Sequence, residues 1–278
     1  MRTNHYDQPT AYAIVATIDP SEQVRRWGWE IETPIIGEQR SRADWRETDG
    51  LKFESDPSLS GSECECDCSD CYHSCNCDNC DRSDYLDHCE SCATNEVSTY
   101  DPVMTGTLDQ WARFLERLED NWSPVENWGE NWGGHLHIEA RDLTKRQAVN
   151  VVVAGCHLID LAPNWFTGGE DNYNDRPDRD RLESCVRGEV SPYNTKRQSW
   201  ISITNLPSEP MPYKVGDQPD GRKTTIEFRV FRSTPNRRLI EFRALVSRKL
   251  VEYCQRGGQI YWLTSAKSFE QILTTLGV

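Results

Sequence analysis

Lysine is scarce in this chain: seven of its 31 basic residues are lysine, and the other 24 are arginine. Acidic residues number 45, so the formal net charge is -14. A field of this sign repels phosphate backbones, which argues against a general role in binding nucleic acid. An acidic surface that is poor in lysine suits strong hydration at high salt. We therefore consider a halophilic source, with an ordinary acidic protein as the alternative.

Long apolar runs are also missing. No segment reaches the ~18 consecutive apolar residues that a membrane-spanning helix needs. The apolar stretch at residues 11–18 is short and lacks a small-residue cleavage site, so it predicts a strand and not a signal peptide. We therefore expect a cytoplasmic protein without a membrane partner, whose thiols stay reduced.

The loop motifs of many nucleotide-binding and hydrolytic enzymes are absent as well. The chain contains no GxGxxG, HExxH or GxSxG sequence. Residues 216–224, GDQPDGRKT, come close to the phosphate-binding loop GxxxxGK[ST]. However, Arg222 stands where the lysine belongs, and a predicted strand follows where the motif requires a helix. We therefore reject a nucleotide site of this kind.

What is present indicates a single α+β domain over residues 1–278. Alternating or apolar segments predict strands at residues 11–18, 25–34, 95–103, 135–140, 199–205 and 224–231, and a strand or a hairpin at residues 44–61. Helical periodicity predicts helices at residues 107–120, 143–161, 236–256 and 268–277. Because these elements do not alternate as βαβ units, we expect a mostly antiparallel sheet packed by helices. The polar segment 164–198 is predicted to be a long surface excursion.

Residues 63–93 form a cysteine-rich segment that we predict to be a zinc-binding insertion. Its CxxC pairs place two thiolates on one turn, as a tetrahedral zinc site requires, and a shell rich in thiolates is closed and structural. The segment is too poor in apolar side chains to fold by burial, so the metal must supply the folding energy. We expect one or two structural Zn²⁺, with free or redox-active thiols as the alternative. The candidate ligands are Cys64, Cys66, Cys68, Cys71, Cys75, Cys77, Cys80, Cys89 and Cys92.

Three predicted strands carry ionisable residues at every second position, which points both members of each pair to the same face. Carboxylates bind Mg²⁺ and arginine meets phosphate oxygens, so such a face suits metal ions and a polyphosphate. The alternatives are a solvated outer face, structural histidines and a surface salt bridge. Gly133 and Gly134 precede the histidines and would let a ligand approach the backbone. The pairs are Glu30/Glu32, His135/His137 and Glu227/Arg229, with Arg232 just beyond the last pair.

Five motifs in a fixed order resemble the amidoligases that are common in phages and bacteria. They are GWEIET (28–33), DPSLSG (56–61), NEVST (95–99), GGHLHI (133–138) and IEFRVF (226–231). This family comprises carboxylate–amine ligases with a glutamine-synthetase-like catalytic fold. The resemblance spans about residues 25–256 and implies a curved, mostly antiparallel sheet that holds ATP and two or three Mg²⁺ on its concave face. It also implies that the cysteine-rich segment is inserted between the second and third motifs, and that a viral gene is one possible origin.

The resemblance further implies roles for individual residues. The magnesium ligands would be Glu30, Glu32, Glu96, His135 and Glu227. The nucleotide would contact His135, His137, Arg229 and Arg232, and the catalytic group would comprise His137, Glu227 and Arg229. The family usually has a proline after the serine of the third motif, whereas this chain has Thr99, which weakens the assignment of the Ser98 turn more than that of Glu96.

The implied reaction joins a carboxylate to an amine. ATP would convert the carboxylate to an acyl phosphate, and the amine would then displace phosphate to give an amide. The metal ions and Arg229 would neutralise charge on the transferred phosphoryl group. The substrates could be small molecules or protein side chains. The alternative from another class is a catalytically inactive, metal-stabilised binding protein or a virus-associated structural protein.

Overall fold

The structure of the chain is a computed structural model. Within β1 beyond Glu30, and throughout β2 and β3, only the backbone is described. The described residues are 25–34, 51–54, 94–99, 133–168, 199–214, 224–232 and 236–278, with residues 180, 184 and 234. The predicted strand at 11–18, the helix at 107–120 and the cysteine-rich segment at 63–93 lie outside them.

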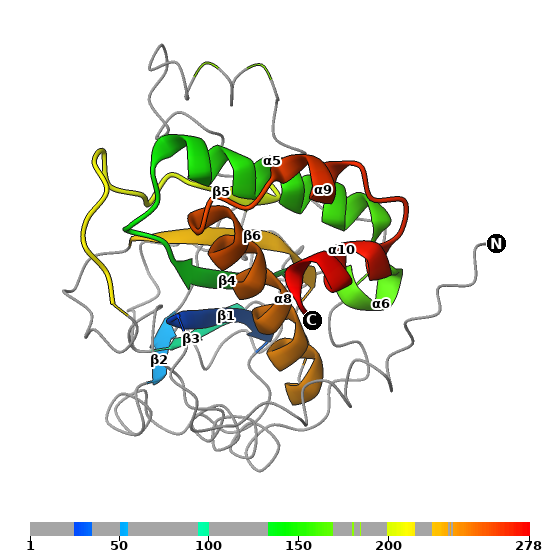
Figure 1. Cartoon of the computed structure of the whole chain (residues 1–278). Coiled ribbons are helices and arrows are strands. Elements are labelled where there is room, and N and C mark those ends of the chain that lie inside the picture. Colours follow the sequence, from blue (N-terminus) through cyan, green and yellow to red (C-terminus); the bar gives the residue numbers. More distant parts are fainter. Residues whose placement is uncertain are drawn as a thin grey trace, which may run out of the picture.

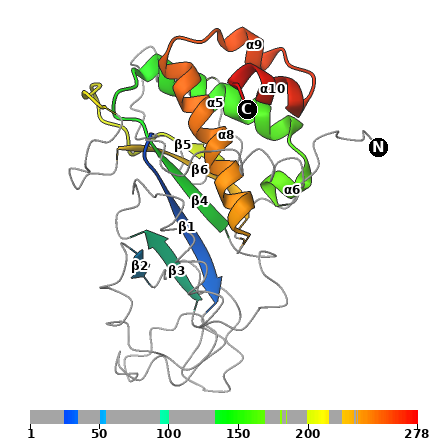
Figure 2. The ribbon, with the colours of Figure 1, turned by 60° about the horizontal axis from the view of Figure 1, so that its bottom comes forward.

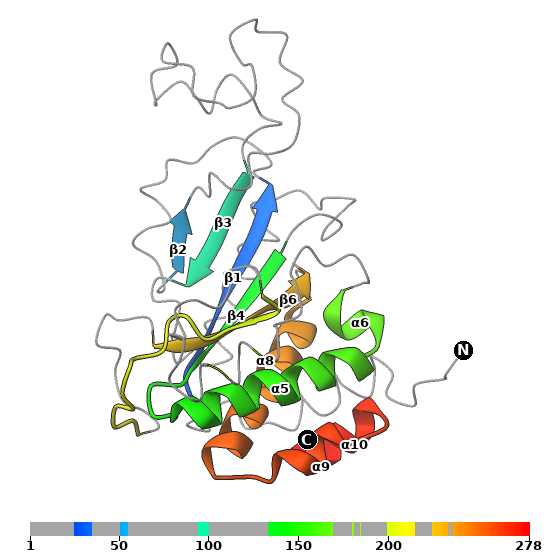
Figure 3. The same ribbon diagram turned by 90° about the horizontal axis from the view of Figure 1, so that it is seen from above.

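A six-stranded sheet in the order β2-β3-β1-β4-β6-β5 organises the described residues, and each neighbouring pair is antiparallel (Figures 2 and 3). Each strand falls within or overlaps a segment that alternation or apolar content had predicted to be extended. The strands are β1 (Trp27–Pro34), β2 (Leu51–Glu54), β3 (Thr94–Thr99), β4 (Gly133–Glu139), β5 (Ile201–Ser202) and β6 (Thr225–Arg232).

Helices pack at the β4-β6-β5 end of the sheet, whereas β2 and β3 lie at the other end (Figures 1 and 2). Among the described residues there are five helices, and two of them, α6 and α9, were not predicted. The short α6 begins the segment that we had expected to be irregular, so that expectation was wrong at its start. The helices are α5 (Lys145–Leu161), α6 (Asn164–Thr167), α8 (Arg237–Gln255), α9 (Ile260–Thr264) and α10 (Phe269–Leu276).

Polar side chains fix where the long helices begin. At α5, Thr144 Oγ1 accepts from the Gln147 backbone N–H at 3.3 Å, and Gln147 Oε1 accepts from the Thr144 N–H at 2.8 Å. This reciprocal pair is a capping box and satisfies two backbone donors that the helix leaves unpaired. Asn236 caps α8 by accepting from the Leu239 N–H at 3.1 Å. These caps explain why the predicted boundaries of both helices lie within two residues of the observed ones.

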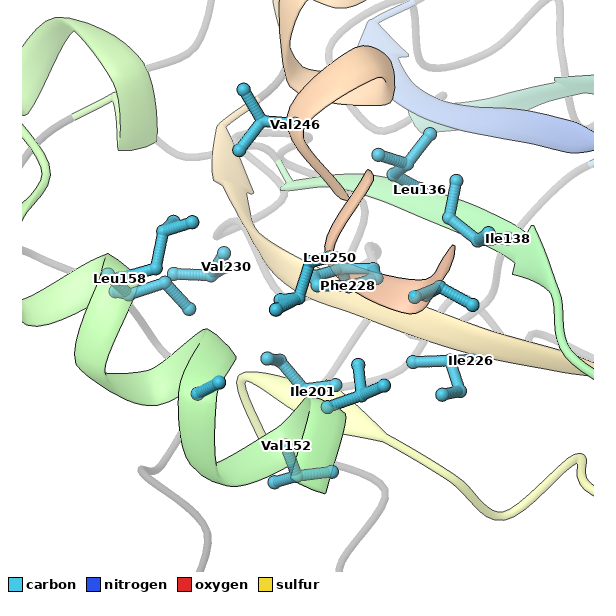
Figure 4. Close-up of a cluster of buried hydrophobic side chains, with 14 of the residues drawn as sticks. Leu136, Ile138, Val152, Leu158, Ile201, Ile226, Phe228, Val230, Val246 and Leu250 are labelled. Atoms are coloured by element: carbon cyan, nitrogen blue, oxygen red, sulfur yellow. The ribbon is translucent and has the colours of Figure 1, made fainter. Parts of the chain in front are cut away.

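The face of β4 and β6 that meets the helices is apolar. Leu136, Ile138, Ile226 and Phe228 all lie on it and are buried, and residues of α5 and α8 such as Leu250 pack against them (Figure 4). Because side chains alternate along a strand, the residues between these apolar positions must point to the opposite face. That alternation places the ionisable residues of the same strands together on the face away from the helices. None of the described helices is long and apolar enough to cross a membrane.

We had expected a ligand to approach the backbone at Gly133 and Gly134. In the structure, the indole of Trp29 makes the close approach at Gly134. A Cβ atom at residue 134 would lie 2.8 Å from Trp29 Cζ2 and 3.3 Å from the Arg232 carbonyl oxygen. Trp29 is fully buried and stacks on Phe231 with ring centroids 5.7 Å apart, so it cannot swing away. At this position, glycine therefore serves packing within the core.

The Gly134→Ala variant is expected to unfold more easily, with a free energy of unfolding lowered by about 1–3 kcal/mol, because the added methyl group overpacks a rigid site. Urea denaturation measures this change. Trp29→Phe removes the ring atoms nearest Gly134, so the same alanine should cost less in that background. An equal cost in both backgrounds would show that Trp29 is not the reason for the glycine.

Candidate metal centre

The strand register brings the ionisable residues of three strands together. In the antiparallel pairing of β1 with β4, Glu30 lies opposite His135, and in that of β4 with β6, His137 lies opposite Glu227. Opposite residues of an antiparallel pair project from the same face, with Cβ atoms about 5 Å apart. Four side chains from positions up to 197 residues apart in the chain therefore converge on one point of the sheet.

Their polar atoms lie close to one another. His137 Nε2 is 3.0 Å from Glu30 Oε1, and it is 4.0 Å from Glu227 Oε1. His135 Nδ1 is 3.2 Å from Glu30 Oε2 and 3.6 Å from Glu227 Oε1. One ligand atom each from Glu30, His137 and Glu227 can be chosen so that all three lie within 4.8 Å of one another. This spacing allows the three residues to bind one metal ion.

All four side chains are buried, which excludes the solvated outer face as an explanation for Glu30. Burial by itself raises the pKa of Glu30, but the charge of His137 and hydrogen bonds from His135 and His137 outweigh it and hold the pKa well below its usual range. Burial likewise raises the pKa of Glu227, whereas His137, His135 and Arg229 lower it, and the net direction is down. Both carboxylates are therefore in the anionic form that a cation needs.

A hydroxyl group orients His137. His137 Nδ1 lies 3.0 Å from Oγ1 of Thr225, which is the first residue of β6 and is itself buried. The charge of His137 that lowers the pKa of the glutamates belongs to its doubly protonated form. A bound cation would take the place of the Nε2 proton. With Nδ1 donating to the Thr225 hydroxyl, the lone pair of Nε2 would then face the cation, as in many metal-binding histidines. Two carboxylates and one imidazole suit Mn²⁺ or Mg²⁺, with the imidazole favouring Mn²⁺. The donor set therefore fits a divalent cation.

The two arginines that were predicted to contact nucleotide are placed differently from each other. Arg229 is half-buried, and its Nη1 donates to Glu227 Oε1, so its partner here is a carboxylate on the same strand. The stem of Arg232 instead packs next to Gly168, where a Cβ atom would lie 2.5 Å from that of Arg232. Arg229 therefore borders the candidate centre, and Arg232 lies at the end of β6 near α6.

The remaining predicted ligands are known only by backbone position or lie outside the described residues. Glu32 is opposite Glu96 in the pairing of β1 with β3, and Glu96 is opposite Glu54 in the pairing of β3 with β2. The register thus aligns the three glutamates across three adjacent strands. The nine cysteines of the predicted zinc sites lie outside the described residues, so the zinc prediction stays a prediction.

A second buried ionic cluster, which we did not predict, lies on the same sheet face. Glu139 Oε2 accepts from Arg26 Nη2 at 2.9 Å and from Arg141 Nη2 at 2.8 Å. Burial raises the pKa of Glu139, but the hydrogen bonds from Arg141 and Thr224 outweigh it and hold the pKa below its usual range. Glu139 continues the alternation of His135 and His137 along β4. This spacing is the feature of the sequence that could have placed Glu139 on the same face.

No family model matches the chain, and no curated protein or solved structure matches it closely enough to indicate a relationship. The resemblance to amidoligases therefore rests on the five sequence motifs. Residues from three of those motifs, represented by Glu30, His137 and Glu227, meet in the candidate metal centre.

Proposed function

We propose that this protein is an ATP-dependent amidoligase that joins a carboxylate to an amine through an acyl phosphate. The observation that carries the proposal is the convergence of Glu30, His137 and Glu227, whose ligand atoms lie within 4.8 Å of one another on one face of an antiparallel sheet. In the family that the sequence resembles, residues at these positions bind metal and nucleotide. The glutamine-synthetase-like assignment of the fold belongs to the same proposal.

A divalent cation held by Glu30, His137 and Glu227 would supply charge neutralisation for phosphoryl transfer. The chain's own residues prepare the site for it. The two glutamates are ionised, and Thr225 holds His137 in one orientation. A guanidinium group, from Arg229, lies at the edge of the same cluster, where it can stabilise a further anionic oxygen.

The burial of the candidate centre also fits a second function, that of a metal-stabilised protein without catalytic activity. The side chains of Glu30, His135, His137 and Glu227 are each at most 9% exposed, which also suits a metal ion that only stabilises the fold. A metal-stabilised binding protein or virus-associated structural protein would bind the cation in the same way but would not turn over ATP. Binding and turnover must therefore be measured on the same preparation.

The test is product analysis by mass spectrometry after incubation with ATP, Mg²⁺ or Mn²⁺, and mixtures of amines and carboxylates. The proposal expects ADP, phosphate and a product whose mass is the sum of one amine and one carboxylate less water. All three should depend on the divalent cation. Metal binding without any such product would favour the binding-protein alternative. If the protein neither binds metal nor forms product, both candidate functions are contradicted.

A further inference from the structure

Arg26, immediately before β1, is buried with part of its hydrogen-bonding capacity unused. Its side chain is 1% exposed, and its Nη2 donates to Glu139 Oε2 at 2.9 Å. Its Nε and Nη1 have no hydrogen-bond partner among the described residues. Because a buried N–H without an acceptor is destabilising, the three hydrogens on these two nitrogens need an acceptor at this point.

The adjacent Arg25 shows how the fold treats a guanidinium group that is purely structural. Arg25 Nη1 and Nη2 donate to the two carboxylate oxygens of Asp142 at 2.7 and 2.8 Å. Nη1 also donates to the carbonyl oxygen of Glu139 at 2.7 Å. Arg25 thus has a carboxylate of its own and a fork-to-fork geometry, whereas Arg26 has only one oxygen of a shared carboxylate.

The Glu139 carboxylate cannot accept a further hydrogen bond from Arg26. Its Oε2 already accepts from Arg26 and Arg141, and its Oε1 accepts from Thr224 Oγ1 at 2.7 Å. Oε1 also lies 3.2 Å from the backbone nitrogens of Ala140 and Arg141. Five donors for one carboxylate leave no free lone pair that faces Arg26.

The guanidinium groups around Glu139 also favour an anion at this point. Arg25, Arg26 and Arg141 all donate to oxygens of Glu139 and therefore lie close together. An anion that accepts from Arg26 would satisfy the unmet donors on its Nε and Nη1 in charge-assisted hydrogen bonds.

We propose that the Arg26–Arg141 cluster binds an oxyanion, either a phosphate or a carboxylate. Glu139 follows His137 by two residues on β4, so this site lies about 7 Å along the sheet from the candidate metal centre. A ligand with two anionic groups at that separation would reach both. The oxyanion site needs neither a metal ion nor ATP turnover, so it stands or falls independently of the proposed function.

The experiment is isothermal titration calorimetry on the full chain in a buffer with EDTA, at ionic strength held constant with chloride. The probes are inorganic phosphate, pyrophosphate and succinate. We expect at least one probe to bind, and we expect Arg26→Gln to weaken it by about tenfold or more, because a charge-assisted hydrogen bond is lost. Arg256→Gln, which removes an exposed arginine at the end of α8, is the matched control and should bind as the wild type does.

The outcomes separate the two sources of the anion. Binding of phosphate or pyrophosphate alone assigns the site to a phosphate-bearing ligand, and binding of succinate alone assigns it to a carboxylate. If Arg26→Gln does not fold, as judged by circular dichroism, Arg26→Lys keeps the charge but offers fewer donors and should bind several-fold more weakly. The proposal is overturned if no probe binds above the chloride background, or if a folded Arg26 variant binds as tightly as the wild type.

Discussion

The Glu227→Gln variant is expected to bind Mn²⁺ at least about 100-fold more weakly than the wild type, because loss of a direct ligand should exceed the 10–100-fold effect of its supporting contacts. Glutamine keeps the size of the side chain and removes only the negative charge. Of the three described ligands, Glu30 would then be the remaining carboxylate, and the positive charge of Arg229 would no longer be offset by Glu227. Calorimetric titration with Mn²⁺ measures the change.

Glu241→Gln provides the matched control for that experiment. Glu241 is also a buried glutamate beside an arginine, with Arg237 Nε 2.6 Å from its Oε1, but it lies on α8 and outside the metal-ligand group. The control should bind Mn²⁺ as the wild type does. Wild-type affinity in Glu227→Gln would remove Glu227 from the centre, and equal losses in both variants would point to a general effect on folding.

Periodicity predicted most of the described elements because their buried faces are continuous. The alternation through Trp29 and Glu30 identified β1, and the amphipathic pattern that ends before Gly257 identified α8. The five-residue α9 was missed because a helix of that length shows barely more than one turn of any pattern. Tyr261 and Trp262 in α9 are moreover largely exposed, so its sequence carries no clear apolar stripe.

The candidate centre could be predicted as a set of residue types, but its pairing could not. Alternation places Glu30, His137 and Glu227 on faces of three strands, yet the order of the strands in the sheet decides whether those faces meet. A shift of register by one residue would turn a whole strand over. The irregularity between Gly134 and Leu136 in the pairing of β4 with β6 is one such local shift of register. No pattern of residues in the sequence predicted it.

The Arg26 cluster was missed for a related reason. Arg26 and Glu139 are 113 residues apart, and an arginine ahead of a strand usually lies in solvent. Only the pairing of β1 with β4, continued by the hydrogen bond from the Glu139 N–H to the Arg26 carbonyl at 2.9 Å, brings them together. Alternation along β4 indicates the sheet face of Glu139, but no local pattern indicates that Arg26 is its partner.

The Glu139→Gln variant is expected to lose about 3–5 kcal/mol in the free energy of unfolding, because it leaves two buried guanidinium groups without their carboxylate. Arg26 and Glu139 are each 1% exposed, so water cannot replace the lost charge without opening the sheet. Urea denaturation measures the loss. A change below about 1 kcal/mol would show that the cluster contributes no more than a surface ion pair does.

Asp142→Asn is the matched control, since it removes the same charge from the neighbouring pair with Arg25. The side chain of Asp142 is 15% exposed, so water can partly solvate the pair, and the expected loss is smaller than at Glu139. Phosphate adds a further distinction. If Arg26 and Arg141 hold an oxyanion, phosphate should restore part of the stability of Glu139→Gln, because the variant removes the carboxylate charge that these two arginines share. Asp142→Asn should gain no more from phosphate than the wild type, since its change lies at Arg25.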